Sequence, residues 1–376
     1  MKSLLGGVNF SDLRTMKRDK ILIITNHSYM LWQFRRELIA KLMESYEVIL
    51  SMPFVGHEND FMAMGLRCIR TEIDRRGVNP VKDFKLIEFY RKMLQEVKPD
   101  LVITYSIKPN IYAGLLCGRM GIPFCANVQG LGTAFEKPGL AQFVTVLYRQ
   151  SFRKVGMVFF ENTENAREFL TRRIVPKQKV KVLHGAGINL DYYAYQPYPR
   201  NEKFHFLYLG RIMKEKGIDE LFDAVRQLKK EKADFILDLV GFFEDDYEQQ
   251  VQDLEREGIV KFHGFQEDPR PFYAMSDCVV LPSYHEGMSN VLLEAAATGR
   301  PLITTDVSGC REAVIPEESG LLVQIKDAES LYRAMRKMLN LSQQERSLMG
   351  QKGRERMRDE FRKETVIEET IQGLIK

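Results

Sequence analysis

The chain has 376 residues, of which 44% are hydrophobic and 28% charged, with a formal net charge of +4. These values exclude disorder of the whole chain, and the length suggests two domains. No apolar run reaches the roughly 18–20 residues of a membrane span, and residues 1–10 lack a secretory signal pattern. The five cysteines lie far apart in the sequence, which favours reduced structural thiols over a zinc site.

Charge is divided unevenly along the chain. Residues 1–195 hold 29 Lys+Arg and 18 Asp+Glu, a net +11, whereas the remainder holds 26 and 33, a net −7. Such a split indicates that the first half meets something anionic: nucleic acid, a membrane surface or a phosphorylated substrate. The alternative is a chance bias of the surface.

Short apolar runs alternate with helix-length segments in the first half of the chain. After a leader at 1–19, buried strands are predicted at 21–24, 48–50, 101–104, 124–126 and 158–160. One helix begins at Asn79-Pro80 and ends before Pro99, with Phe84, Ile87, Leu94 and Val97 on its apolar face. A second helix spans 109–120, where a glycine follows its end.

The same alternation starts again after residues 185–200, which have no periodicity and are rich in Gly, Pro and Tyr. Strands are predicted at 206–209, 235–240, 260–262, 279–281 and 302–304. Alternating βα units form parallel sheets that are covered on both faces. The sequence therefore predicts an α/β fold of two doubly wound, Rossmann-like domains facing a cleft.

The predicted domains are an N-terminal domain at 20–184 and, after a linker at 185–203, a second domain at 204–341. A charged helical tail follows at 342–376, and we expect it to pack back on the first domain. Its apolar stripe comprises Met357, Phe361, Val366, Ile367, Ile371 and Leu374.

The first motif with chemical meaning is GRIMKEKG at 210–217, between a strand and a helix. Gly210 permits a tight turn, and Arg211 and Lys216 extend from one loop at a helix N-terminus. Two cations backed by a helix dipole suit a diphosphate. The alternative is a solvated basic loop.

The second motif is SYHEGMSN at 283–290, which leads into the apolar helix 291–298. Glu286 lies on the loop, and Glu294 lies eight positions later inside the helix. A buried carboxylate needs partners, and a sugar diol would supply two hydroxyl donors. Alternatively, Asn290, Glu294 and Thr298 form the wet stripe of an amphipathic helix.

A third motif, NVQGLG at 127–132, follows a first-domain strand, and its glycines would let the backbone approach a ligand. Other chemistry is poorly supported. The sequence has no G-x-G-x-x-G after a strand, no P-loop, no G-x-S-x-G and no histidine spacing typical of a metal site. Three acids at 244–246 are interpreted as the opening of a helix, where they complement its dipole.

Together the motifs resemble the family-4 retaining glycosyltransferases of the GT-B fold, over nearly the whole chain from Lys20. The segments G-R-x-x-x-x-K-G and E-G-x-x-N-x-x-x-E match in order and spacing, and residues 278–314 are the strongest match. The members that can be compared are bacterial enzymes that glycosylate undecaprenyl-diphosphate-linked sugars.

The resemblance implies that 20–184 is the acceptor-binding domain and 204–341 the nucleotide-sugar-binding domain, and it implies roles for the matching residues. Arg211 and Lys216 would hold the donor diphosphate, Glu294 the ribose hydroxyls, and Glu286 the donor sugar; the catalytic candidates are Glu286, Arg211 and Lys216. The full donor-site prediction is Gly210, Arg211, Lys216, His263, Gly264, Phe265, Glu286, Gly287, Met288, Ser289, Asn290 and Glu294, with the nucleotide base near 263–265. The acceptor-side prediction is Gln129, Gly130, Gly132, His27 and Lys108.

The resemblance also implies a reaction without a protein nucleophile, in which the leaving phosphate takes the acceptor's proton. No cofactor, metal or nucleic acid is expected. Two departures concern the acceptor-facing domain: many relatives have His where this chain has Gln129, and a Gly-rich loop where it has residues 26–30. They leave the sugar and the acceptor open.

We therefore expect transfer of a hexose or N-acetylhexosamine from a nucleotide-diphosphate sugar, UDP before GDP, to a glycan or lipid-linked acceptor. A nucleotide-sugar 2-epimerase and a non-catalytic nucleotide-sugar sensor are the rival hypotheses. The segment 140–154 interleaves aromatic and basic residues. It predicts a cytoplasmic enzyme that lies peripherally on the anionic inner face of the cell membrane, the alternative being a buried helix with a basic end.

Overall fold

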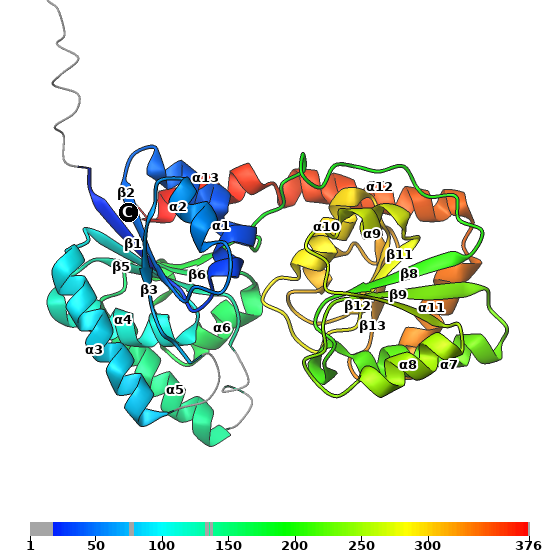
Figure 1. Ribbon diagram of the computed structural model, residues 1–376, viewed down its shortest axis with the longest axis horizontal. Helices are drawn as coiled ribbons and strands as arrows, with labels where there is room; N and C mark the ends of the chain where they lie inside the picture. Colours follow the sequence, from blue (N-terminus) through cyan, green and yellow to red (C-terminus); the bar gives the residue numbers. More distant parts are fainter. Residues whose placement is uncertain (1–17, 75–78, 132–134, 136–137, 375–376) are drawn as a thin grey trace, which may run out of the picture.

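The structure is a computed structural model that describes residues 18–74, 79–131, 135 and 138–374. It has two α/β domains side by side, each built on a parallel sheet (Figure 1). The first sheet has the order β3-β2-β1-β4-β5-β6-β7 and the second the order β10-β9-β8-β11-β12-β13. The predicted fold class of two doubly wound parallel sheets is confirmed.

The strands of the first sheet are β1 (Lys20–Ile24), β2 (Glu47–Met52), β3 (Arg67–Arg70), β4 (Leu101–Tyr105), β5 (Phe124–Val128), β6 (Val158–Phe160) and β7 (Val180–Val182). Its helices are α1 (Ser28–Met43), α2 (Glu58–Ala63), α3 (Pro80–Val97), α4 (Ile107–Met120), α5 (Pro138–Ser151) and α6 (Thr163–Thr171). One buried cluster joins the sheet to α3, α4, α5 and α6, and another joins its opposite face to α1, α2 and the C-terminal helix α13 (Lys363–Leu374). The sheet is thus covered on both faces.

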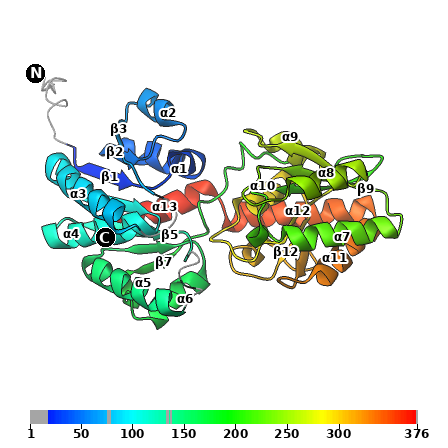
Figure 2. The same cartoon turned by 60° about the horizontal axis from the view of Figure 1, so that its bottom comes forward.

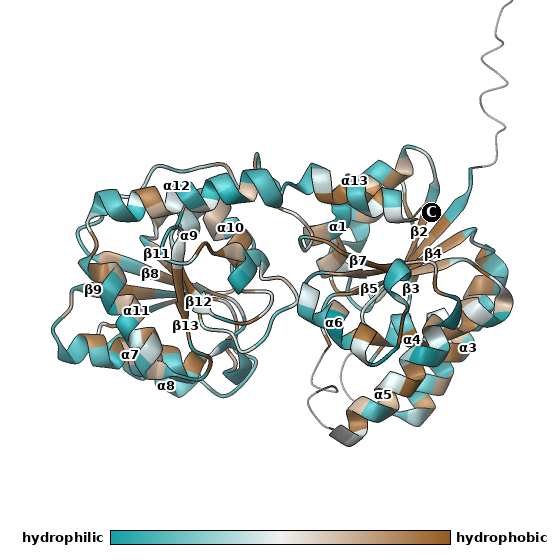
Figure 3. Ribbon diagram, turned by 180° about the vertical axis from the view of Figure 1, so that it is seen from behind, coloured by the Kyte–Doolittle hydropathy of each residue, from teal (hydrophilic) through white to brown (hydrophobic). Residues whose placement is uncertain are grey.

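The second sheet comprises β8 (Phe204–Leu209), β9 (Phe235–Val240), β10 (Val260–Gly264), β11 (Cys278–Leu281), β12 (Leu302–Thr305) and β13 (Gly320–Val323). The helices in this part of the chain are α7 (Ile218–Lys230), α8 (Glu248–Arg256), α9 (Arg270–Met275), α10 (Asn290–Thr298), α11 (Ala328–Asn340) and α12 (Gln343–Glu360), and α13 (Lys363–Leu374) follows them. Figure 2 shows each sheet inside its own domain, with the two domains side by side, and Figure 3 shows apolar strands between helices whose outer faces are polar.

Helix α3 begins as its sequence predicts but turns a different face to the core. The Asn79 side chain accepts hydrogen bonds from Val81 N and Lys82 N, both at 3.1 Å, and Pro80 takes the first helical position. The predicted apolar face is wrong for Phe84, which is 70% exposed. The buried stripe is Leu86, Tyr90, Met93, Leu94 and Val97.

The C-terminal tail crosses from one domain to the other. Helix α12 packs on α10 of the second domain, and α13 packs beside α1 of the first (Figure 1). The expected apolar stripe is therefore shared between two cores: Met357 and Phe361 belong to the second, and Val366 and Leu374 to the first.

The two chain crossings between the domains are hydrogen-bonded to each other. Ile188 N donates to Phe361 O at 2.7 Å, and Lys363 N donates to Ile188 O at 3.1 Å. Gly187, with φ of 68°, lies against this bridge, where a Cβ would come within 2.8 Å of the Lys363 Cα. The linker and the start of α13 thus form one two-stranded hinge.

Candidate active site between the two domains

A cavity of about 370 Å³ lies at the carboxyl ends of β8 to β11, with α1 of the first domain opposite. Open parallel sheets bind ligands at this edge. Nine of the predicted donor-site residues line it: Gly210, Arg211, Lys216, Phe265, Glu286, Met288, Ser289, Asn290 and Glu294.

Close backbone approaches shape the loop after β8. A Cβ at Gly241 would overlap the Gly210 carbonyl oxygen, and a Cβ at Gly217, whose φ is 72°, would overlap the Pro282 carbonyl oxygen. Glycine removes both clashes. The loop that carries Lys216 can therefore lie directly against the loop that follows β11.

Two cations of the first motif lie in this cavity with different partners. Lys216 Nζ forms an ion pair with Glu286 Oε1, which also accepts a hydrogen bond from Ser283 Oγ at 2.8 Å. The Arg211 guanidinium is half-exposed and lies 3.6 Å from Glu244 Oε2. Both cations are positioned to meet an anion that enters the cavity.

The sequence interpretation of the acids at 244–246 is wrong, because α8 begins only at Glu248. Glu244 instead faces Arg211, and Asp245 Oδ2 accepts a hydrogen bond from Lys214 N at 2.9 Å. These acids support the cationic loop after β8. Glu244 and Asp245 directly follow Phe243, which bridges to Ile212, and the backbone amides of both acids donate to Ile212 O; this pairing places them beside the loop.

Helix α10 directs its N-terminus and one carboxylate toward the cavity. Its N-cap, Ser289, makes no side-chain hydrogen bond to the helix, and its first residue, Asn290, lines the cavity. The amides and dipole of such a helix start favour an anionic group. The diphosphate candidates Arg211 and Lys216 face the same space.

Glu294 lies in the interior of α10 and is only 4% exposed. Tyr273 OH donates a hydrogen bond to Glu294 Oε2 at 2.8 Å. Burial raises the pKa of Glu294 to about 7, against the opposing effect of hydrogen bonds from Tyr273 and Tyr193. The wet-stripe alternative is wrong, because Thr298 is buried as well and donates to Glu294 O.

The predicted base-binding segment divides between the cavity and the sheet. Phe265 lines the cavity beside Phe242, with ring centroids 6.3 Å apart. Neither His263 nor Gly264 is among the lining residues. His263 Nε2 instead lies 2.7 Å from Asp238 Oδ1, whose other oxygen pairs with His205. At the predicted base site, the cavity is therefore lined by Phe242 and Phe265 and not by His263. The sequence analysis did not predict that Phe242 would lie beside Phe265.

The acceptor-side candidates are dispersed. Gln129 Nε2 lies 3.4 Å from Met30 Sδ, and the Gln129 carbonyl contacts Gly287 across the domain boundary. The ring of His27 packs near Tyr29. Lys108 forms a 2.8 Å ion pair with Asp83 between α4 and α3, and neither Lys108 nor Gly130 lines the cavity. Gly132 lies outside the described residues.

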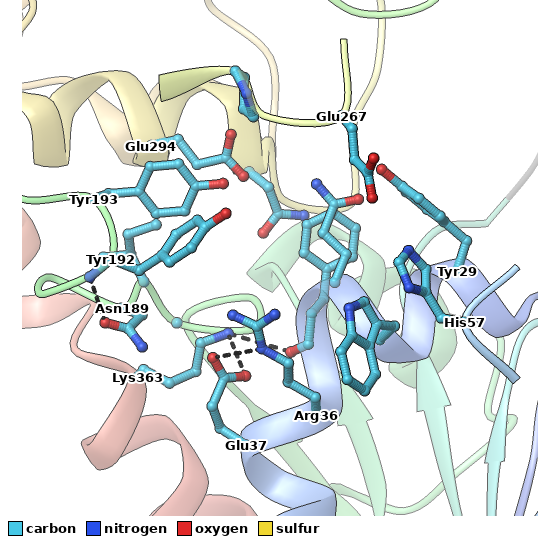
Figure 4. Close-up of a pocket in the computed structure, with 17 residues that line it drawn as sticks. Tyr29, Arg36, Glu37, His57, Asn189, Tyr192, Tyr193, Glu267, Glu294 and Lys363 are labelled. Atoms are coloured by element: carbon cyan, nitrogen blue, oxygen red, sulfur yellow. Dashed lines mark hydrogen bonds and ion pairs between the residues drawn. The ribbon is translucent and has the colours of Figure 1, made fainter. Parts of the chain in front are cut away.

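A second, polar cavity of about 120 Å³ adjoins the first and shares Glu294 with it (Figure 4). Helix α1 contributes Arg36 and Glu37, and α13 contributes Lys363, whose ammonium lies 3.3 Å from Phe34 O. Burial lowers the pKa of Lys363 to about 8. The tail is expected from the sequence to pack back on the first domain, but no sequence motif indicates that Lys363 would meet α1 at this cavity.

Within the part of the chain that the structure describes, no three His, Cys, Asp or Glu side chains gather in a way that could hold a metal ion. Over the same residues, no helix is both long and apolar enough to span a bilayer.

Two family descriptions match consecutive parts of the chain. "Glycosyl transferase 4-like" matches residues 20–162, and "Glycosyl transferases group 1" matches residues 196–356. The chain belongs to these glycosyltransferases. The predicted family resemblance and enzyme class are confirmed, and the two matches fall on the two domains described above.

Two curated relatives of this glycosyltransferase are similar over most of their length. An N,N'-diacetylbacillosaminyl-diphospho-undecaprenol alpha-1,3-N-acetylgalactosaminyltransferase of Campylobacter jejuni is 28% identical, with 80% of this chain and 84% of the relative covered. A UDP-Gal:alpha-D-GlcNAc-diphosphoundecaprenol alpha-1,3-galactosyltransferase of Escherichia coli is 24% identical, with 78% and 80% covered.

Solved structures show the same fold at low sequence identity. HepE of Anabaena, in complex with UDP and glucose, superposes with a TM-score of 0.78 at 16% identity, over 95% of this glycosyltransferase and 100% of HepE. Sucrose-phosphate synthase of Thermosynechococcus elongatus superposes with a TM-score of 0.75 at 21% identity, over 94% and 98%.

Proposed function

We propose that this glycosyltransferase transfers a hexose or N-acetylhexosamine from a UDP-sugar to a glycan acceptor carried on a polyprenyl diphosphate, in the biosynthesis of a surface glycan. The observation that carries the donor assignment is the cavity between the domains, with Arg211 and Lys216 on one part of its wall and Glu294 on another. A nucleotide diphosphate has the matching chemistry, an anionic centre beside a ribose diol. The Campylobacter and Escherichia relatives, which are named for diphospho-undecaprenol-linked acceptors, support the lipid-linked acceptor.

In the proposed reaction the bond between the sugar C1 and the diphosphate oxygen breaks, and a bond from C1 to the acceptor oxygen forms on the same face. The acceptor's proton passes to the leaving phosphate oxygen. Negative charge grows on the diphosphate, where Arg211, Lys216 and the start of α10 would stabilise it. Glu286 keeps Lys216 in place and would contact the donor sugar.

Aromatic side chains on the cavity wall offer the nucleotide base a surface to stack on. Phe242 and Phe265 are 45% and 55% exposed on the cavity wall, which is costly for large apolar rings unless a ligand covers them. Tyr29 reaches toward Phe265 from the first domain, with centroids 6.5 Å apart. A base held there would contact both domains.

Peripheral attachment to an anionic membrane is part of the proposal. The layer formed by α3, α4 and α5 leaves Phe84, Phe143 and Val146 exposed, and Arg153 and Lys154 are exposed at the end of α5. Exposed aromatic and basic side chains together favour the interface of an anionic bilayer. Arg149 is exposed as well, and its guanidinium donates two hydrogen bonds to Arg172 O.

The test is a screen of UDP- and GDP-sugars against polyprenyl-diphosphate-linked acceptors, read by mass spectrometry, with the anomeric configuration of the product read by NMR. We expect product only when both a UDP-sugar and a lipid-linked acceptor are present. Epimerised UDP-sugar without acceptor would favour the 2-epimerase instead. UDP binding without turnover on any acceptor would favour the sensor.

A further inference from the structure

The loop that carries Glu286 is held by a side chain of the other domain. Asn162, which follows β6, donates through Nδ2 to Gly287 O at 2.6 Å and lies 3.4 Å from Glu286 O. Asn162 is itself only 2% exposed. The donor-side loop therefore depends on a hydrogen bond that exists only while the two domains lie together.

The first domain also presses on the same loop. A Cβ at Gly287 would overlap the Gln129 carbonyl oxygen and come within 3.0 Å of Glu161 Oε2. On the other side of the loop, a Cβ at Gly309 would come within 2.5 Å of Glu286 O. Residues 286 and 287 are thus enclosed between backbone of both domains, with no room for a side chain at 287.

Glu161, which precedes Asn162 in the chain, is held in the first domain by an ion pair. Glu161 Oε1 accepts a hydrogen bond from Arg35 of α1 at 2.6 Å, with both side chains nearly buried. Burial raises the pKa of Glu161, and the Arg35 charge opposes that rise. The ends of β5 and β6 and helix α1 therefore present one rigid polar surface to the loop.

We infer that Asn162 is a positioning residue of the transfer reaction, which fixes the main chain of Glu286 and Gly287 and thereby the Lys216–Glu286 pair when the domains close. The inference rests on the proposed role of this pair at the donor. Asn162 has a second task, because its Oδ1 accepts from Asn165 N at 2.8 Å and caps α6. A useful test must separate the two.

Two variants, Asn162→Asp and Asn162→Ser, separate the hydrogen bond to Gly287 O from the capping of α6. Both residues cap helices well, so α6 keeps its cap, but neither offers an N–H donor to Gly287 O. Asn79→Asp is the matched control, since Asn79 caps α3 in the same way, away from the cavity. The measurements are kcat and KM for the UDP-sugar, the melting temperature, and hydrogen–deuterium exchange of peptides covering 284–290 and 163–171.

We expect both Asn162 variants to lower kcat by roughly tenfold or more, since one buried hydrogen bond to the loop is lost. The melting temperature should stay within about 2 °C of the wild type, and exchange should rise at 284–290 but not at 163–171. Asn79→Asp should match the wild type. Unchanged exchange at 284–290 would overturn the inference, and so would a loss of activity that only follows unfolding of α6.

The exchange measurement also separates this inference from the proposed function. If no donor and acceptor pair gives turnover with the wild type, the substrate assignment fails. Faster exchange at 284–290 in both Asn162 variants would still support the interdomain hold, and unchanged exchange would still refute it.

Discussion

Lys216 and Glu286 form an ion pair although 70 residues separate them in the chain. The pair joins the loop after β8 to the loop after β11, and both side chains are largely shielded from solvent. A carboxylate beside the lysine keeps it ordered before any donor arrives. The two positions should therefore act together on the donor.

Lys216→Ala should lower kcat/KM for the donor by about 10- to 100-fold, and Arg211→Ala by a similar factor, because each removes a charge-assisted contact of about 1.5–3 kcal/mol. Steady-state release of UDP measures both. Lys214→Ala is the control from the same turn. The Lys214 ammonium is exposed, and its one ion pair, with the exposed Asp219, is long at 3.9 Å. Turnover like that of the wild type in both active-site variants would exclude the diphosphate assignment.

Glu294 should make UDP binding depend on pH. Its pKa of about 7 means that the carboxylate form, which in the proposed complex would accept hydrogen bonds from two ribose hydroxyls, is lost as the pH falls through 7. Calorimetric titration should show UDP binding about tenfold weaker at pH 6 than at pH 8. Glu294→Gln removes this slope and leaves the one that belongs to UDP itself, so equal slopes in both proteins would contradict the prediction.

The same group also affects stability. The pKa of Glu294 is raised on folding, from 4.5 to about 7, so the folded state binds the extra proton. Its contribution to the free energy of unfolding is full below about pH 4.5 and is lost as the pH rises through 7. Denaturant unfolding of the wild type and Glu294→Gln at pH 5 and 8 tests this. The free energy of unfolding should fall between pH 5 and pH 8 in the wild type, and it should fall by less in Glu294→Gln.

Activity should persist in EDTA, since Arg211, Lys216 and the start of α10 already supply positive charge for the leaving diphosphate. UDP release in excess EDTA, compared with release in added Mg²⁺, measures this. Complete loss in EDTA that Mg²⁺ or Mn²⁺ restores would show that a metal ion shares the charge.

Phe143→Ser with Val146→Ser should weaken binding to vesicles that contain phosphatidylglycerol several-fold, because both side chains are exposed on α5 and would enter the interface. Co-sedimentation at low and high salt measures binding, which should fall as salt rises. Leu348→Ser is the matched control, since Leu348 is equally exposed but lies on α12 of the second domain. A wild type that ignores these vesicles at low salt would favour a soluble acceptor.

The interior strands could be predicted because burial on both faces makes each of them a short run of apolar residues. The strands missing from the prediction are β3, β7 and β13, and all three are edge strands. An edge strand contacts a neighbour on one side only, so charged residues such as Arg67 and Arg70 of β3 and Lys181 of β7 are tolerated there and hide the apolar signal. Strand β13 has no charged residue, but it is only four residues long and begins with Gly320.

The same distinction applies to the site. Two local motifs, each continuous in the chain, predict the candidate residues Arg211, Lys216, Glu286 and Glu294. Asn162, Glu244 and Lys363 reach the cavity region through contacts between segments far apart in the chain, and the residue types alone carry no record of them. The glycine at 287 was noted, but its reason, a carbonyl from the opposite domain, required the fold.

The bridge between Ile188 and Arg362 has a consequence for protein engineering. The chain passes between the domains twice at one place, and α13, which comes last in the sequence, completes a core made mostly of residues before 184. A chimera cut once between the domains would exchange the second domain together with a helix that packs on the first. Two cuts, one on each strand of the hinge, keep Val366 and Leu374 with their own α1, and such two-cut chimeras are the ones that should fold and allow donor specificity to be transplanted.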